Sequence, residues 1–155
     1  MTVSEFGFLP SIQEVCRQLK IFGYLIIVIT NQPEVSRGNL SIKTLESINS
    51  LVYNTLPVDS IKVCIHSDED KCKCRKPLPQ LIYDACEEFN INPRDSWMVG
   101  DRWKDIDCGY SAGCKTIFID YGYDETFHNI PNFIVKDVSD IVEVIKVHDF
   151  CFSQR

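Results

Sequence analysis

Short apolar runs alternate with amphipathic helical segments along this chain, and the alternation restricts the folds that it can form. The β-branched run Leu25–Ile29 follows a segment, 10–21, whose apolar residues recur at helical spacing, and Gly23 separates the two. Further expected strands at 61–65, 97–99, 116–119 and 133–135 alternate with expected helices at 41–54, 78–89, 103–112 and 139–147. Strands joined by helices pair in parallel, and parallel sheets are covered on both faces. The sequence therefore predicts an α/β sandwich around a mostly parallel sheet.

The length and charge limit the domain count and the kinds of partner. At 155 residues and 45% hydrophobic content, the chain is expected to form a single domain over residues 1–155. A formal net charge of -6 argues against a nucleic-acid partner. No apolar run approaches the roughly 20 residues of a membrane span. Eight cysteines without a charged and then apolar N-terminal leader favour a reducing compartment, so we expect a cytoplasmic protein.

Four potential metal ligands lie close together after the expected strand at 61–65. They form the pairs Cys64-x-His66 and Cys72-x-Cys74, separated by the polar residues 67–71. Three thiolates and one imidazole suit a closed tetrahedral zinc site, and a loop this polar needs such a metal to become ordered. The sequence predicts a structural zinc ion held by these four residues. The alternative is a cluster of free thiols or a Cys72–Cys74 disulfide.

Polar groups follow several of the expected strands, where parallel α/β sheets bind their ligands. They are Thr30-Asn31-Gln32, Arg75-Lys76 after the cysteine loop, and Gly100-Asp101-Arg102 followed by Asp105. Taken singly, each of these groups has an ordinary structural explanation: a polar turn for the first, a solvated basic pair for the second and a helix cap for the third. Taken in order, a hydroxyl, a lysine and paired aspartates supply what phosphoryl transfer with Mg²⁺ requires.

These segments resemble a known family. Val28–Gln32, Arg75-Lys76-Pro77 and Val99–Asp105 are similar to motifs two, three and four of the haloacid dehalogenase superfamily. The cysteine-histidine loop narrows the resemblance to the histidinol-phosphate and D-glycero-D-manno-heptose-1,7-bisphosphate phosphatases, and the resemblance covers about residues 6–145. It implies a Rossmann-like three-layer fold and Mg²⁺-dependent hydrolysis of a sugar- or polyol-phosphate monoester.

The resemblance also assigns roles to individual residues. Thr30 and Lys76 would stabilise the transferring phosphoryl group, and Asp105 would orient Lys76 or a metal-bound water. The implied substrate-binding residues are Thr30, Asn31, Gln32, Arg75, Lys76 and Arg102. The implied metal ligands are Asp101 for Mg²⁺ and Cys64, His66, Cys72 and Cys74 for zinc.

One motif of the family is not found among these residues. The family begins with Asp-x-Asp-Gly-Thr at the end of a central strand, which supplies the attacking carboxylate and the acid-base group. Without that strand, a gap is expected between the strands at 25–29 and 97–99. Either these two strands close on each other, or another chain supplies a strand to an otherwise monomeric protein, or the sequence is a fragment or a truncated product. We favour the last and expect impaired activity; a non-catalytic phosphosugar-binding or interaction protein is the alternative.

Overall fold

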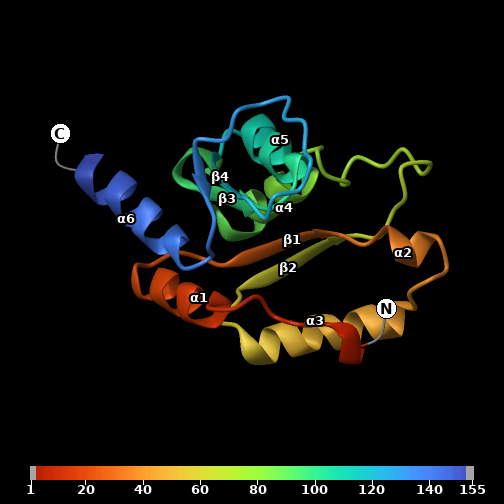
Figure 1. Ribbon diagram of the computed structural model, residues 1–155. Helices are drawn as coiled ribbons and strands as arrows, with labels where there is room; N and C mark the ends of the chain where they lie inside the picture. The colour runs from red at the N-terminus through yellow and green to blue at the C-terminus, as the bar shows by residue number, and fades with distance from the viewer. Residues whose placement is uncertain (1–2, 153–155) are drawn as a thin grey trace.

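The computed structural model describes residues 3–152, and it alternates strands with helices as the sequence predicts (Figure 1). The strands are β1 (Ile27–Asn31), β2 (Ser60–Cys64), β3 (Trp97–Gly100), β4 (Lys115–Ile119) and β5 (Phe133–Val135). The α-helices are α1 (Ile12–Ile21), α2 (Pro33–Ser36), α3 (Ile42–Thr55), α4 (Gln80–Phe89), α5 (Trp103–Ala112) and α6 (Asp140–Phe152). Short 3₁₀ helices occupy Val3–Glu5 and Pro93–Asp95.

The strands pair in parallel, but they form two separate sheets. β1 pairs with β2, and β3, β4 and β5 pair in that order. β1 and β3 therefore have no partner on one side among the described strands, and a cavity of about 680 Å³ lies between them. The expected gap is confirmed, and the alternative in which the two strands close on each other is wrong for the described residues.

Helices cover both faces of the two sheets, which gives the predicted three-layer arrangement (Figure 1). On one face, α1 and α3 pack on β1 and β2 through Cys16, Val52 and Leu56, and α6 packs on β4 and β5. On the other face, α4 contacts β1 and β2, and α5 contacts β3 and β4. None of the helices in the described part of the chain has both the length and the apolar character needed to cross a bilayer.

Most element boundaries lie within two residues of their predicted positions. α3 begins after Ser41, whose hydroxyl accepts from the Thr44 N–H at 3.0 Å, as its predicted role of N-cap requires. The largest difference at a strand is in β1, which begins at Ile27 rather than Leu25. Two hydrogen bonds between Ile26 and Asp59 explain this. The Ile26 N–H donates to the Asp59 carboxylate at 2.6 Å, and the Asp59 N–H donates to the Ile26 carbonyl at 2.8 Å.

Candidate functional site

Lys76 lies where the carboxyl ends of β1 and β3 approach each other. Its Nζ donates to the Ile29 carbonyl of β1 at 2.9 Å and to the Asp105 carboxylate at 2.6 Å. Asp105 lies in the first turn of α5, directly after β3. The Lys76 and Asp105 side chains are 12% and 8% exposed, so most of this ion pair is shielded from water. A single ammonium group thus joins the two halves of the structure at one edge.

Asn31 fixes the main chain of Lys76. Its amide nitrogen donates to the Lys76 carbonyl at 3.1 Å, and its amide oxygen accepts from the Lys76 N–H at 3.0 Å. Both ends of the Asn31 amide are therefore engaged with protein. This geometry favours a positioning role for Asn31, whereas the sequence suggested a residue that lines the phosphate pocket.

Thr30 and Gln32 flank Asn31 and bond to each other. The Gln32 side-chain nitrogen donates to the Thr30 hydroxyl at 3.2 Å. The hydroxyl accepts this bond and keeps its own hydrogen to donate. Thr30 therefore keeps a hydroxyl hydrogen to donate at the end of β1, next in the chain to Asn31.

Asp105 reaches Lys76 because β3 ends in a residue without a side chain. A Cβ atom on Gly100 would lie 2.3 Å from the Asp105 Cβ, a separation that real structures do not tolerate. The second Asp105 oxygen accepts from the Arg102 N–H at 3.1 Å and caps α5. Gly100 and this cap together fix the carboxylate that holds Lys76.

A second carboxylate, that of Glu125 in the loop after β4, contacts the start of α5. Glu125 accepts from the Arg102 Nε at 2.5 Å and from the Trp103 N–H at 2.8 Å. The Arg102 and Trp103 N–H groups at the start of the helix donate to these two carboxylates, so neither is available to an anion.

Asp101 and the loop after β4 form the rim of this site. The Asp101 carboxylate makes no hydrogen bond or ion pair with any other residue that the structure describes. Burial, with the charge of Asp101 as the next contribution, raises the pKa of Tyr121, which places the Tyr121 hydroxyl in the field of that carboxylate. The Arg102 guanidinium lies 5.3 Å from the centre of the Tyr123 ring. The sequence motifs did not indicate residues 121–125 as part of the site, although their place soon after the end of β4 was a usable signal.

The four predicted ligands of the cysteine loop come together and could hold a metal ion. Their ligand atoms all lie within 4.8 Å of one another. The Cys72 and Cys74 sulfurs are 3.7 Å apart, which is too far for a disulfide, and both cysteines are free. Burial, followed by the hydrogen bond with Cys74, raises the pKa of the Cys64 thiol to about 12 in the absence of a metal. The predicted cluster is confirmed, and the disulfide alternative is wrong.

Arg75 faces the cysteine loop. Its Nε donates to Asp68 at 2.7 Å, and a terminal nitrogen donates to the His66 carbonyl at 3.3 Å. The bond with Asp68 raises the pKa of Arg75, so the guanidinium is charged at any ordinary pH. The structure thus gives Arg75 a bracing contact, whereas the sequence suggested contact with substrate.

Comparison with known proteins identifies relatives of this fold and sequence. The family model for HAD-hydrolase-like proteins matches residues 73–141. The chain is 32% identical over 158 residues to a D-glycero-β-D-manno-heptose-1,7-bisphosphate 7-phosphatase of Pasteurella multocida (strain Pm70). This match covers 93% of this chain and 86% of that protein. A phosphatase of the same name from Helicobacter pylori (strain ATCC 700392 / 26695) is 34% identical over 72% of this chain and 68% of its own length.

A solved structure has the same fold. It is a D,D-heptose 1,7-bisphosphate phosphatase from B. bronchiseptica, complexed with magnesium and phosphate. It matches with a TM-score of 0.80 and 23% identity, over 95% of this chain and 88% of that chain. The three-layer arrangement is therefore that of a known fold.

Proposed function

The chain belongs to the haloacid-dehalogenase-like hydrolase family, and we propose that it forms the phosphate-binding part of a phosphatase that acts on a phosphorylated sugar or polyol. The observation that carries the proposal is the position of Lys76, whose ammonium group is held between the Ile29 carbonyl and Asp105. A largely buried ammonium fixed at the carboxyl edge of parallel strands suits a phosphoryl oxygen. Relatives named as heptose-bisphosphate phosphatases support the same reaction class.

The proposed roles follow from the hydrogen bonds of each side chain. Lys76 neutralises charge on the phosphoryl group, and Thr30 donates its hydroxyl hydrogen to a second oxygen. Asp105 and Asn31 position Lys76 through its ammonium and its main chain. Such groups accelerate phosphoryl transfer because they are in place before charge develops.

Asp101 fits a magnesium ion. Its carboxylate follows β3 at the site edge and is not engaged by other described side chains, and carboxylate oxygen is the ligand that Mg²⁺ prefers. A bound Mg²⁺ supplies charge neutralisation to the phosphoryl oxygens. The magnesium and phosphate in the related B. bronchiseptica structure support this assignment.

The donor set and spacing of the cysteine loop support zinc. In a regular tetrahedral site, with Zn–S near 2.3 Å and Zn–N near 2.05 Å, neighbouring sulfurs lie about 3.8 Å apart and sulfur to nitrogen about 3.6 Å. Two of the three Sγ–Sγ separations, Cys64–Cys72 and Cys72–Cys74, are 3.7 Å, and Nδ1 of His66 lies 3.6 Å from the Cys64 sulfur and 3.4 Å from the Cys74 sulfur. We propose that the ion is structural, because four protein ligands leave no open position.

The substrate proposal is a heptose bisphosphate, with histidinol phosphate as the second candidate. The named relatives support the first, and the aromatic rim of Tyr121 and Tyr123, with ring centres 6.1 Å apart, offers surface to a sugar. The family resemblance also implies an attacking carboxylate. Asp105 is committed to Lys76, and Asp101 is proposed as a metal ligand. We therefore propose that the nucleophile comes from a segment placed between β1 and β3.

Calorimetric titration with inorganic phosphate, with Mg²⁺ and with a chelator, tests the proposal. Phosphate should bind more tightly with Mg²⁺, and Asp101→Asn should abolish that dependence. Asp84→Asn is the control, because Asp84 lies exposed on α4. A phosphate affinity that changes neither with Mg²⁺ nor with Asp101→Asn would contradict the proposed site.

Phosphate release from heptose 1,7-bisphosphate measures the reaction itself. The 155-residue chain alone should bind phosphate but release none above background. Release that Asp101→Asn abolishes would show that the described residues include the nucleophile, contrary to our proposal.

A further inference from the structure

Glu125 is a buried carboxylate to which the proposed reaction assigns no role. Its side chain is 4% exposed, although it lies in the loop that follows β4. One oxygen accepts from the Arg102 Nε at 2.5 Å, and the other accepts from the Trp103 N–H at 2.8 Å. A carboxylate removed from water is stable only when its oxygens are bonded, and both Glu125 oxygens have partners. The main chain of α5 therefore fixes Glu125, and Glu125 in turn holds one charged side chain, that of Arg102.

The Arg102 guanidinium is held on one edge and free on the other. Its Nε is bonded to Glu125, and its central carbon lies 5.3 Å from the centre of the Tyr123 ring. The two outer nitrogens, Nη1 and Nη2, make no hydrogen bond with any residue that the structure describes. An arginine that is 59% exposed normally samples many rotamers, but the carboxylate and the ring restrict this one. Two N–H donors of known orientation are therefore available to a ligand.

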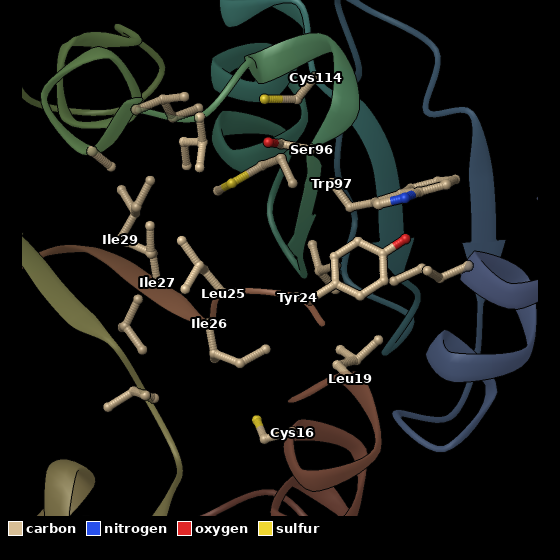
Figure 2. Close-up of a pocket in the computed structure, with 18 of the residues that line it drawn as sticks. Cys16, Leu19, Tyr24, Leu25, Ile26, Ile27, Ile29, Ser96, Trp97 and Cys114 are labelled. Carbon is tan, nitrogen blue, oxygen red and sulfur yellow. The ribbon is translucent and has the colours of Figure 1, made fainter. Parts of the chain in front are cut away.

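Lys76 and Arg102 are held by different parts of the molecule. β3 has β4 on one side and the cavity on the other. Figure 2 shows Ile29 of β1 across this cavity from Trp97 of β3, and Lys76 bonds the Ile29 carbonyl. The Arg102 side chain is bonded instead to Glu125, which follows β4. The two cations would therefore contact different groups of a ligand bound at the end of β3.

Glu125 has two opposing effects on an anionic ligand of Arg102. Its negative charge repels the ligand, whereas its hydrogen bond orients the guanidinium. Water and salt screen the repulsion, because the guanidinium is more than half exposed. Binding also costs entropy for each long side chain that a ligand immobilises, and an arginine that is already held avoids part of that cost. We expect positioning to outweigh repulsion.

We propose that Glu125 is a positioning residue that holds the outer nitrogens of Arg102 for a second anionic group of the substrate, and that the Tyr123 ring supports the same orientation. The inference rests on the proposed function, in which Lys76 binds the first phosphoryl group. Two parallel N–H donors match two oxygens of a phosphate or carboxylate. Glu125 thereby raises the preference for a bisphosphate over a single phosphate without touching either.

Calorimetric titration of the 155-residue chain with inorganic phosphate and with heptose 1,7-bisphosphate, both with Mg²⁺, tests the proposal. Glu125→Gln has one amide oxygen and can accept only one of the two bonds. It should lower the affinity for the bisphosphate relative to that for inorganic phosphate by about three- to tenfold. Loss of the negative charge alone would change this ratio in the opposite direction. Glu14→Gln, in the exposed pair with Arg17, is the control and should leave the ratio unchanged.

A double-variant cycle separates positioning from a purely structural role of Glu125. In the Arg102→Met background, Glu125→Gln should change the affinity ratio no further, because no guanidinium remains to be oriented. Tyr123→Leu, at an exposed ring, should lower the ratio in the same direction and keeps the test informative if Glu125→Gln does not fold. Tyr110→Leu, at an exposed tyrosine of α5, is its matched control.

Nitrogen NMR of the arginine side chains tests the contact without any ligand. The Arg102 Nε–H should exchange slowly with water in the wild-type chain, since it donates to a buried carboxylate, and faster in Glu125→Gln. Equal exchange in the two chains would show that Glu125 does not hold Arg102.

Failure of this inference is distinguishable from failure of the proposed function. A wild-type chain that binds no inorganic phosphate would contradict the proposed function itself. If inorganic phosphate binds but the affinity ratio is unchanged or higher in Glu125→Gln, the proposed function stands and the positioning role is wrong. An effect of Glu125→Gln that persists in full in the Arg102→Met background would overturn the inference in the same way.

Discussion

At the scale of single residues, the site depends on one buried ion pair and on the main-chain groups that position it. Lys76 receives contacts from Ile29, Asn31 and Asp105, which belong to elements far apart in the sequence. The residue types at the strand ends predicted that these groups meet. They did not predict that Asn31 would bind the main chain of Lys76, or that Arg75 would face Asp68. Both outcomes depend on side-chain directions within loops, which spacing alone does not determine.

The ion pair predicts non-additive effects on stability. Lys76→Met leaves the Asp105 carboxylate buried and unpaired, which should cost about 3–5 kcal/mol of unfolding free energy. Adding Asp105→Asn to Lys76→Met should recover most of this loss, because the buried charge is then removed. Urea unfolding of the two single variants and the double variant measures the coupling. Simple additivity would show that the pair is exposed in solution.

Gly100 should be intolerant of even a methyl group. Gly100→Ala would bring the new Cβ to 2.3 Å from the Asp105 Cβ, so Asp105 must move away from Lys76. We expect a loss of about 1–3 kcal/mol in thermal or urea unfolding. Gly7→Ala is the matched control, since a Cβ there meets no atom within 4 Å. Equal stability of the two variants would refute the close approach.

At the scale of elements, the loop between β2 and α4 should depend on its metal. Purified protein should contain one zinc per chain, because one four-ligand cluster is formed. Cys74→Ser should lower that content strongly and speed amide exchange in residues 66–75, since the metal would hold the two ends of the loop together. Cys86→Ser, at a thiol outside the cluster, should change neither quantity. Full zinc content in Cys74→Ser would contradict the four-ligand site.

The docking of α6 should depend on pH through Asp149. Burial alone would raise the pKa of this carboxyl, but hydrogen bonds from Tyr24, Lys115, Trp97 and His148 outweigh burial and hold the pKa well below its usual range. Because the pKa is lower in the folded chain, the stabilisation is complete above the unfolded pKa of about 4 and is lost as the pH falls below it.

Urea unfolding at about pH 7 and about pH 3 measures this contribution. Asp149→Asn should lose less stability on acidification than wild type, whereas the exposed control Asp84→Asn should lose as much as wild type. An unchanged pH dependence in Asp149→Asn would show that the carboxylate has no such bonds in solution.

The sequence predicted the elements better than their exact ends. The apolar periodicity found each long helix and each described strand, because burial on a regular face leaves a strong pattern. α2 was missed, since its four residues, Pro33–Ser36, are too few to show any period. α6 extends to Phe152, five residues beyond the predicted end at Val147, which is itself 51% exposed.

At the scale of the whole molecule, the two sheets meet through helices and through Lys76 rather than through strand pairing. The resemblance to a family with a central strand predicted this gap, and the structure confirms it with an apolar cavity between β1 and β3. No residue pattern within the chain alone reveals an unpaired edge, because an edge is defined by what lies beside it.

Calorimetric titration with inorganic phosphate in the presence of Mg²⁺ tests the central claim most directly. The claim is that Lys76, held by Asp105 and Ile29, binds the phosphoryl group. Asp105→Asn serves as the reference, and Lys43→Met, at an exposed lysine on α3, serves as the charge control. In the Asp105→Asn background, Lys76→Met should weaken phosphate binding by roughly tenfold or more, the value of one charge-assisted hydrogen bond, while Lys43→Met leaves it unchanged. Equal phosphate affinity with and without the Lys76 ammonium would contradict the account.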